Sequence, residues 1–93
     1  HKMRIKRPFH LIIYEILTTL LQENEYGKYP PISGILYACG MSYSAWDKVE
    51  FCILNELILP IDPGKKYCHY KISEKGFKYI KIFQQLNQLG KVM

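Results

Sequence analysis

The residues of this 93-residue chain that could do chemistry are mainly its lysines and arginines. Their positive charges suit them to contact a polyanion. The net charge is +5, with 13 Lys and Arg against 8 Asp and Glu. Residues 1–7 carry four bases, residues 8–59 carry two bases against six acids, and residues 60–93 carry seven lysines against two acids. Because basic ends flank an acidic middle, we expect a polyanion to be held by an N-terminal arm and by the C-terminal third.

Residues that could catalyse a reaction or bind a metal stand in no useful pattern. The three cysteines, Cys39, Cys52 and Cys68, lie 13 and 16 residues apart, which is not a zinc-binding spacing. We expect buried thiols in a reducing compartment, with a disulfide left open as an alternative. His10 and His69 have no partner at a spacing that suggests a nucleophile and base, and no phosphate-binding or dinucleotide-binding loop is present. We therefore expect no metal, no cofactor and no enzymatic activity.

The spacing of apolar residues and the turn-forming residues predict the helices and strands that must position the lysines and arginines. Apolar residues recur every three or four positions between residues 9 and 24, which predicts an amphipathic helix. Gly40 is suited to end a second helix, and Ser42 is suited to begin a third. The sequence DPGKK at residues 62–66 predicts a hairpin turn with a basic tip. The predicted elements are helices over 9–24, 32–39 and 42–57, strands over 57–61 and 67–72, and a last helix over 74–89.

Residues 32–51 carry the apolar spacing of a helix-turn-helix motif centred on Gly40. Two short helices that cross steeply over a tight turn need apolar side chains at fixed distances from that glycine. The residues at these positions are Ile35, Cys39, Met41, Trp46 and Val49. One position that is usually small holds Leu36, which predicts a wider helix crossing. We expect Trp46 to be part of the core.

The sequence MSY at 41–43, the tyrosine-rich strand that follows the turn, and the sequence ISEKG at 72–76 extend this pattern. Together they resemble the small archaeal winged-helix DNA-binding proteins over about residues 9–90. The resemblance implies an α+β, mostly α fold of order α-α-α-β-β-α, whose last helix pairs with its copy. We therefore expect a basic arm over 1–8, a winged-helix domain over 9–73 and a C-terminal dimerisation helix over 74–93.

Within this frame the third helix, the hairpin tip and the arm are the expected DNA contacts. The outer face of the third helix would also present Asp47 and Phe51. A solvated surface without a nucleic-acid role is the alternative for each segment. The predicted DNA-binding residues are Arg4, Lys6, Arg7, Ser42, Tyr43, Ser44, Lys48, Lys65 and Lys66. The predicted dimer-interface residues are Phe77, Ile80, Phe83 and Leu86.

The function that we expect is double-stranded DNA binding by a homodimer, as a transcriptional regulator or an architectural chromatin protein. No apolar run approaches 18 residues, so we expect no membrane partner and a cytoplasmic, nucleoid-associated location. The alternative is a winged helix that binds other proteins in a transcription assembly. Asp47 and Glu50 favour that alternative, because carboxylates on a recognition helix repel phosphates.

Overall fold

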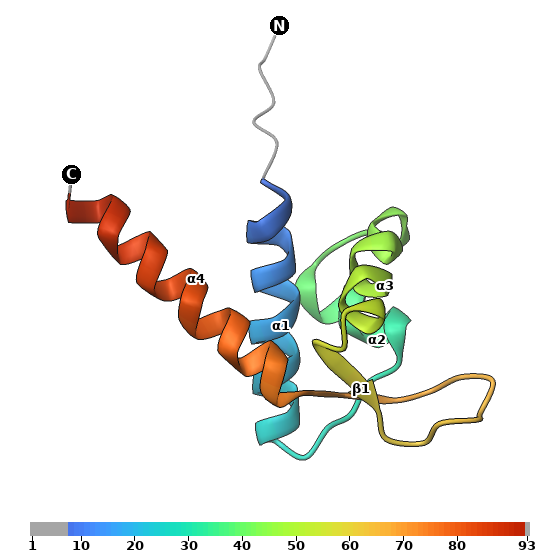
Figure 1. Cartoon of the computed structure of the whole chain (residues 1–93). Coiled ribbons are helices and arrows are strands. Elements are labelled where there is room, and N and C mark those ends of the chain that lie inside the picture. Colours follow the sequence, from blue (N-terminus) through green and yellow to red (C-terminus); the bar gives the residue numbers. More distant parts are fainter. Residues whose placement is uncertain (1–7, 93) are drawn as a thin grey trace, which may run out of the picture.

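The computed structural model describes residues 8–92 of the chain, with side chains as far as residue 87. Within these residues the fold is α+β and mostly helical, as predicted, and its order is compatible with a winged helix (Figure 1). The elements are α1 (Phe9–Glu25), α2 (Ile32–Cys39), the 3-10 turn η1 (Tyr43–Ala45), α3 (Trp46–Leu54), β1 (Ile58–Pro60), β2 (Tyr70–Ile72) and α4 (Glu74–Val92). None of these helices is long and apolar enough to cross a membrane.

Helix α1 is the centre of the core and contacts α2, α3, α4 and β2 (Figure 1). Its apolar residues follow the three-and-four spacing of one helix face, and four of them have no exposed surface: Ile13, Ile16, Leu17 and Leu20. The helix ends where Gly27 adopts a positive φ of 78°. The prediction for this helix, 9–24, is confirmed to within one residue.

The turn between α2 and α3 confirms the predicted role of Gly40. Gly40 adopts a left-handed conformation with φ 70°, and the Met41 N–H donates to the Leu36 carbonyl oxygen at 2.9 Å. Ile35, Leu36 and Val49 are all buried, so the large residue at position 36 is part of the shared core.

The expectation that Trp46 belongs to the core is wrong, because its side chain is 40% exposed. The physical reason lies in the start of the third helix. Residues 43–45 form a 3-10 turn instead of the predicted α-helical turn, so the α-helix begins only at Trp46. The buried residues of α3, Val49 and Cys52, come one and two turns later, and Trp46 lies at the open end of the helix.

The third helix also ends earlier than predicted, at Leu54 instead of residue 57. Glu56 adopts a positive φ of 58°, and the N–H of Leu57 then donates to the Cys52 carbonyl oxygen at 2.8 Å. The chain changes direction at Glu56, and Leu57 and Ile58 then lie in the core, where both are buried.

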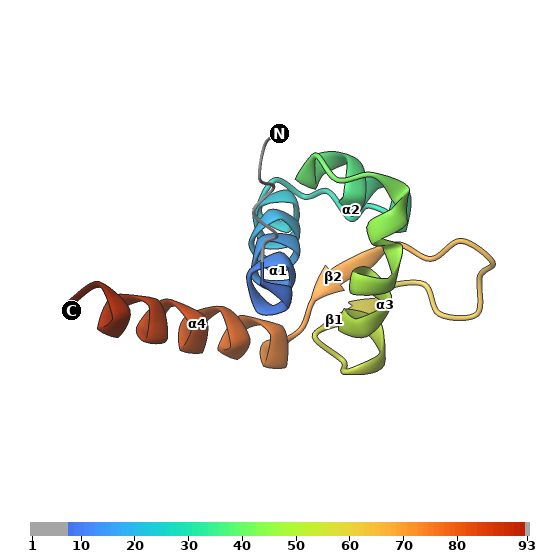
Figure 2. The ribbon, with the colours of Figure 1, turned by 90° about the horizontal axis from the view of Figure 1, so that it is seen from above.

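The sheet is a two-stranded antiparallel ladder with the register Ile58↔Ile72, Leu59↔Lys71 and Pro60↔Tyr70. The last turn of α1 and the segment before α2 both bond to the free edge of β2. The Tyr70 N–H donates to the Pro30 carbonyl oxygen at 3.1 Å, and the Asn24 side-chain oxygen accepts from the Ile72 N–H at 2.8 Å. Residues 61–69, here called the wing loop, extend away from the helices in both views (Figures 1 and 2).

The start of α4 is locked onto the end of α3 by Ser73. The Ser73 hydroxyl lies 2.6 Å from the Glu56 carbonyl oxygen and 2.9 Å from that of Leu57, and it accepts from the Gly76 N–H at 3.0 Å. The hydroxyl is therefore both the N-cap of α4 and a tie to the preceding helix. A Cβ at Gly76 would overlap the Leu57 carbonyl oxygen, so the close approach requires glycine.

Candidate nucleic-acid interface

Two elements carry most of the predicted contacts that lie within the described residues: the segment from Ser42 to Lys48, at η1 and the start of α3, and the wing loop. A hollow of about 270 Å³ brings the two together, because Tyr43 and Lys66 both line it. Ser42 and Lys48 line a separate hollow of about 240 Å³. Four of the six predicted residues in the described part of the chain therefore line one of two hollows, and the other two, Ser44 and Lys65, line neither.

The hydroxyl-bearing residues of η1 are accessible, as a nucleic-acid contact requires. Tyr43 is 63% exposed, and Ser42 and Ser44 are exposed as well. The two serine hydroxyls lie 2.6 Å apart and bond to each other instead of capping the helix. Each hydroxyl has remaining lone pairs or a hydrogen that can reach a phosphate oxygen or a base edge.

Lys48 is less available for contact with a phosphate than its position in the sequence suggested. Its side chain is 26% exposed, and its Nζ lies 3.0 Å from the Asp47 carboxylate. The hydrogen bond from Lys48 holds the pKa of Asp47 below its usual value, so the carboxylate stays charged beside the ammonium. The neutralised pair offers little net positive charge to DNA.

The expectation that Phe51 lies on the outer face of the third helix is wrong. Its ring packs edge-on against Phe9 of α1, with ring centroids 4.8 Å apart. Aromatic pairs favour this T-shaped arrangement, and the contact draws Phe51 toward the core. Phe51 is therefore a packing residue between α1 and α3.

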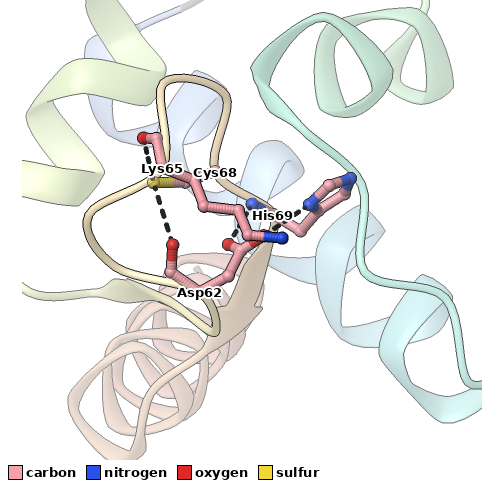
Figure 3. Close-up of polar contacts among 4 residues, drawn as sticks. All are labelled: Asp62, Lys65, Cys68 and His69. Carbon is pink, nitrogen blue, oxygen red and sulfur yellow. Dashed lines mark hydrogen bonds and ion pairs between the residues drawn. The ribbon is translucent and has the colours of Figure 1, made fainter.

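The wing loop is closed at its neck by Asp62 and His69 (Figure 3). The His69 backbone N–H donates to one Asp62 carboxylate oxygen at 2.8 Å, and the His69 Nδ1 lies 2.9 Å from the other. The backbone hydrogen bond from His69, followed by the bond from its ring, lowers the pKa of Asp62. His69 had no partner predicted from the sequence, and in the structure its partner is Asp62.

Cys68 and the turn residues order the interior of the wing loop. The Cys68 Sγ lies 3.4 Å from the Lys65 carbonyl oxygen and 3.7 Å from that of Asp62 (Figure 3). Gly64 adopts a φ of 94°, which confirms the turn predicted at 62–66. The exposed side chains of Lys65 and Lys66 are therefore carried by a loop with internal bonds. The three cysteines form no disulfide, and the expectation of buried thiols holds for Cys52 alone, because Cys39 and Cys68 are half-buried.

Sequence reasoning missed two residues of this region, Ser33 and Tyr67. Both line the 270 Å³ hollow with Tyr43 and Lys66. The Lys66 Nζ lies 5.6 Å from the centroid of the Tyr67 ring, within the range of a cation–π contact. The signal that could have pointed to Ser33 is the Pro-Pro pair before α2, which leaves that helix without a capping side chain. The predicted arm residues Arg4, Lys6 and Arg7 lie outside the described residues.

The predicted dimer face is divided by the structure into buried and exposed parts. Ile80 is 4% exposed and belongs to the core, so it offers almost no surface to a partner. Phe83 is half-buried and stacks on Tyr14 with ring centroids 4.4 Å apart. Phe77 is exposed, and Leu86 is 63% exposed.

Comparison of the chain with known protein families and with curated proteins finds no match.

Proposed function

We propose that the chain is a winged-helix protein that binds double-stranded DNA, of the kind that the sequence resembles. The observation that carries the proposal is the joint placement of two elements. Tyr43 of the exposed, hydroxyl-bearing η1 lines the same hollow as the wing loop, whose tip presents two lysines. A recognition helix in the major groove and a wing on the adjacent backbone would use these two surfaces together.

Charge supports this assignment for the wing loop more than for α3. Lys65 and Lys66 form no ion pair in the described structure, whereas Lys48 is bound to Asp47. Each unpaired lysine that meets a phosphate releases a condensed counterion, and this release supplies most of the affinity for DNA of any sequence. The wing loop, together with the arm over 1–8, would then supply most of the affinity for DNA. The hydroxyl groups of η1 would set the position of the protein on the duplex.

Replacing Lys65 and Lys66 together by Ala tests the wing contact. We expect affinity to fall to a similar extent on unrelated DNA sequences, and the log–log salt slope to become shallower by about two units. Lys75→Ala with Lys78→Ala is the matched control, because both of these lysines are exposed on α4 and the net charge changes equally. An unchanged slope in the wing variant would remove the wing loop from the interface.

We propose further that the protein is a homodimer joined through the second half of α4. This half of the helix extends away from the other elements in both views (Figures 1 and 2). An apolar groove of about 320 Å³ lies where this half begins, between α4 and the start of α1, and is lined by Ile82, Phe83 and Leu86 with His10 and Tyr79. Pairing of two copies would cover this groove and place two recognition helices on one duplex, as a nucleoid-associated regulator or architectural chromatin protein requires.

The neutralised Lys48 favours a second candidate, which is binding of another protein within a transcription assembly. With Lys48 bound to Asp47, α3 itself has little attraction for phosphate. A protein partner would contact the exposed Trp46 and Tyr43, which are residue types enriched at protein interfaces. Replacement of the wing lysines separates the candidates, because it would weaken DNA binding and leave such a protein contact intact.

A further inference from the structure

Asp62 places a negative charge in the wing loop, the segment that is proposed to contact phosphate. It precedes Lys65 and Lys66 by a few residues, and its side chain is 20% exposed. Hydrogen bonds from the backbone and then the ring of His69 lower its pKa, so the carboxylate is charged at neutral pH. A carboxylate beside a DNA backbone opposes binding, because like charges repel each other. The position of this acid therefore calls for a physical reason.

The reason lies in the hydrogen bonds that close the wing loop (Figure 3). Residues 61–69 form no helix or strand, so the shape of the loop depends on bonds within it. The ladder of β1 and β2 is continued by one backbone bond, from the Ile61 N–H to the His69 carbonyl oxygen at 2.9 Å. The His69 N–H then donates to a side chain instead of a backbone carbonyl group, at 2.8 Å from Asp62 Oδ1.

Asp62 is the acceptor at which the two sides of the loop meet. Its second carboxylate oxygen lies 2.9 Å from the Nδ1 of His69. Its backbone carbonyl oxygen accepts from the Lys65 N–H at 3.4 Å and lies 3.7 Å from the Cys68 Sγ. The two bonds of the carboxylate are the shortest of these, and both would be lost with the side chain.

This arrangement leaves the two lysines of the tip available to a partner. The carboxylate is bound to His69, and neither Lys65 nor Lys66 forms an ion pair in the described structure. Both lysines are exposed, on a loop that extends away from the helices (Figures 1 and 2). A loop that is already ordered loses less conformational entropy when it binds, so more of its attraction for phosphate remains as affinity.

We propose that Asp62 is a positioning residue, which orders the wing loop before DNA binds and so presents Lys65 and Lys66 to a phosphate backbone. The inference rests on the proposed function and deepens it. A negatively charged residue thereby favours the binding of a polyanion. Electrostatic repulsion alone gives the opposite sign, because removal of a carboxylate near phosphate strengthens binding. The sign of the change in affinity therefore separates the two effects.

The test compares two replacements of Asp62 by anisotropy on a labelled 30-mer duplex. Asp62→Ala removes both bonds to His69. Asp62→Asn is the matched control, because it removes the same charge and keeps a side-chain oxygen that accepts from the His69 N–H. We expect about a fivefold loss of affinity for Asp62→Ala, from the cost of ordering the loop, and no loss for Asp62→Asn. Equal affinities of the two variants would overturn the proposal, since the variants differ only in the hydrogen bonds of this side chain.

A double-mutant cycle tests whether Asp62 acts through the lysines of the tip. In a chain that carries Lys65→Ala and Lys66→Ala, the wing loop has no charge left to position. We therefore expect Asp62→Ala to change the affinity of that chain by less than about twofold. A loss as large as in the unmodified chain would show that the replacement acts elsewhere in the protein, and it would contradict a positioning role.

The order of the wing loop is measured without DNA, by the NMR order parameters of the Lys65 and Lys66 amides. We expect values above about 0.6 in the unmodified chain and in Asp62→Asn, and below about 0.6 in Asp62→Ala. An Asp62→Ala loop that is as ordered as the unmodified one would overturn the proposal.

The failures of the two proposals are distinguishable. If the unmodified protein binds DNA and the two replacements of Asp62 have equal affinities, the positioning role is wrong and DNA binding stands. If the unmodified protein binds no DNA, but Asp62→Ala lowers the order parameters of the loop, then DNA binding is wrong and the ordering of the loop by Asp62 stands.

Discussion

Cys52 is the residue whose chemistry the fold changes most. Its side chain is completely buried between α1 and the helix-turn-helix segment. Burial, with a smaller contribution from Cys39, raises the pKa of the Cys52 thiol from 9.0 to about 12. The thiol is therefore a packing group in the folded protein and is inert toward electrophiles at neutral pH.

This shift predicts a loss of stability in alkaline solution. Because the folded pKa lies above the unfolded one, the stabilisation is fully present below pH 9 and is lost as the pH rises toward 12. We expect the free energy of unfolding to fall by about 2 kcal/mol between pH 9 and pH 10.5 from this group. Urea denaturation at both pH values measures it, with Cys52→Val as the variant that lacks the titrating thiol.

Tyr70 and Tyr79 also have raised pKa values, mainly through burial, and they contribute in the same direction above pH 10. The difference between the native chain and Cys52→Val isolates the thiol, because both chains retain these tyrosines. An equal alkaline loss in the two chains would show that Cys52 does not titrate between folded and unfolded states.

At the scale of elements, the junction between α3, β1 and α4 depends on Gly76. A methyl group there would meet the Leu57 carbonyl oxygen, and backbone at this position has little room to move. We expect Gly76→Ala to lower the free energy of unfolding by about 2 kcal/mol or more, as overpacking at a close approach does. Denaturant unfolding measures the change, and Lys75→Ala in the same turn is the control, with an expected change within about 0.5 kcal/mol. Equal stability of the two variants would contradict the tight junction.

The helices with strong local signals could be predicted from the sequence. The apolar spacing of α1 and the left-handed Gly40 are determined by residues within one or two turns of each other, and both predictions are confirmed. The wing turn is equally local, since Pro63 presets one torsion angle and Gly64 permits the positive φ of the other.

The structure differs from the prediction where contacts between residues distant in sequence determine the conformation. Glu56 adopts a left-handed conformation that is usually found at glycine. The residue type at this position therefore gave no signal that α3 ends there. Ile80 fits an exposed helix face by spacing, yet it packs into the core around α1. The hollow at Ser33 and Lys66 joins segments more than 30 residues apart, and no local pattern encodes such a meeting.

At the scale of the whole molecule, the proposed dimer requires the part of α4 that the monomer core leaves uncovered. Leu86→Asp changes an exposed residue of this part, so we expect a folded monomer by light scattering with an unchanged helical circular dichroism spectrum. Ile80→Asp places a carboxylate in the core, so we expect it to unfold the chain instead of producing a folded monomer. A Leu86→Asp variant that stays dimeric would place the contact elsewhere.

We propose that this chain binds double-stranded DNA chiefly through its Lys and Arg side chains. The most direct test is fluorescence anisotropy of the full chain on two labelled random-sequence 30-mer duplexes across a salt series. We expect binding to both duplexes with a log–log slope of about −4 or steeper, which corresponds to four or more neutralised phosphates. Absence of binding to either duplex at low salt would contradict it and favour the protein-assembly role.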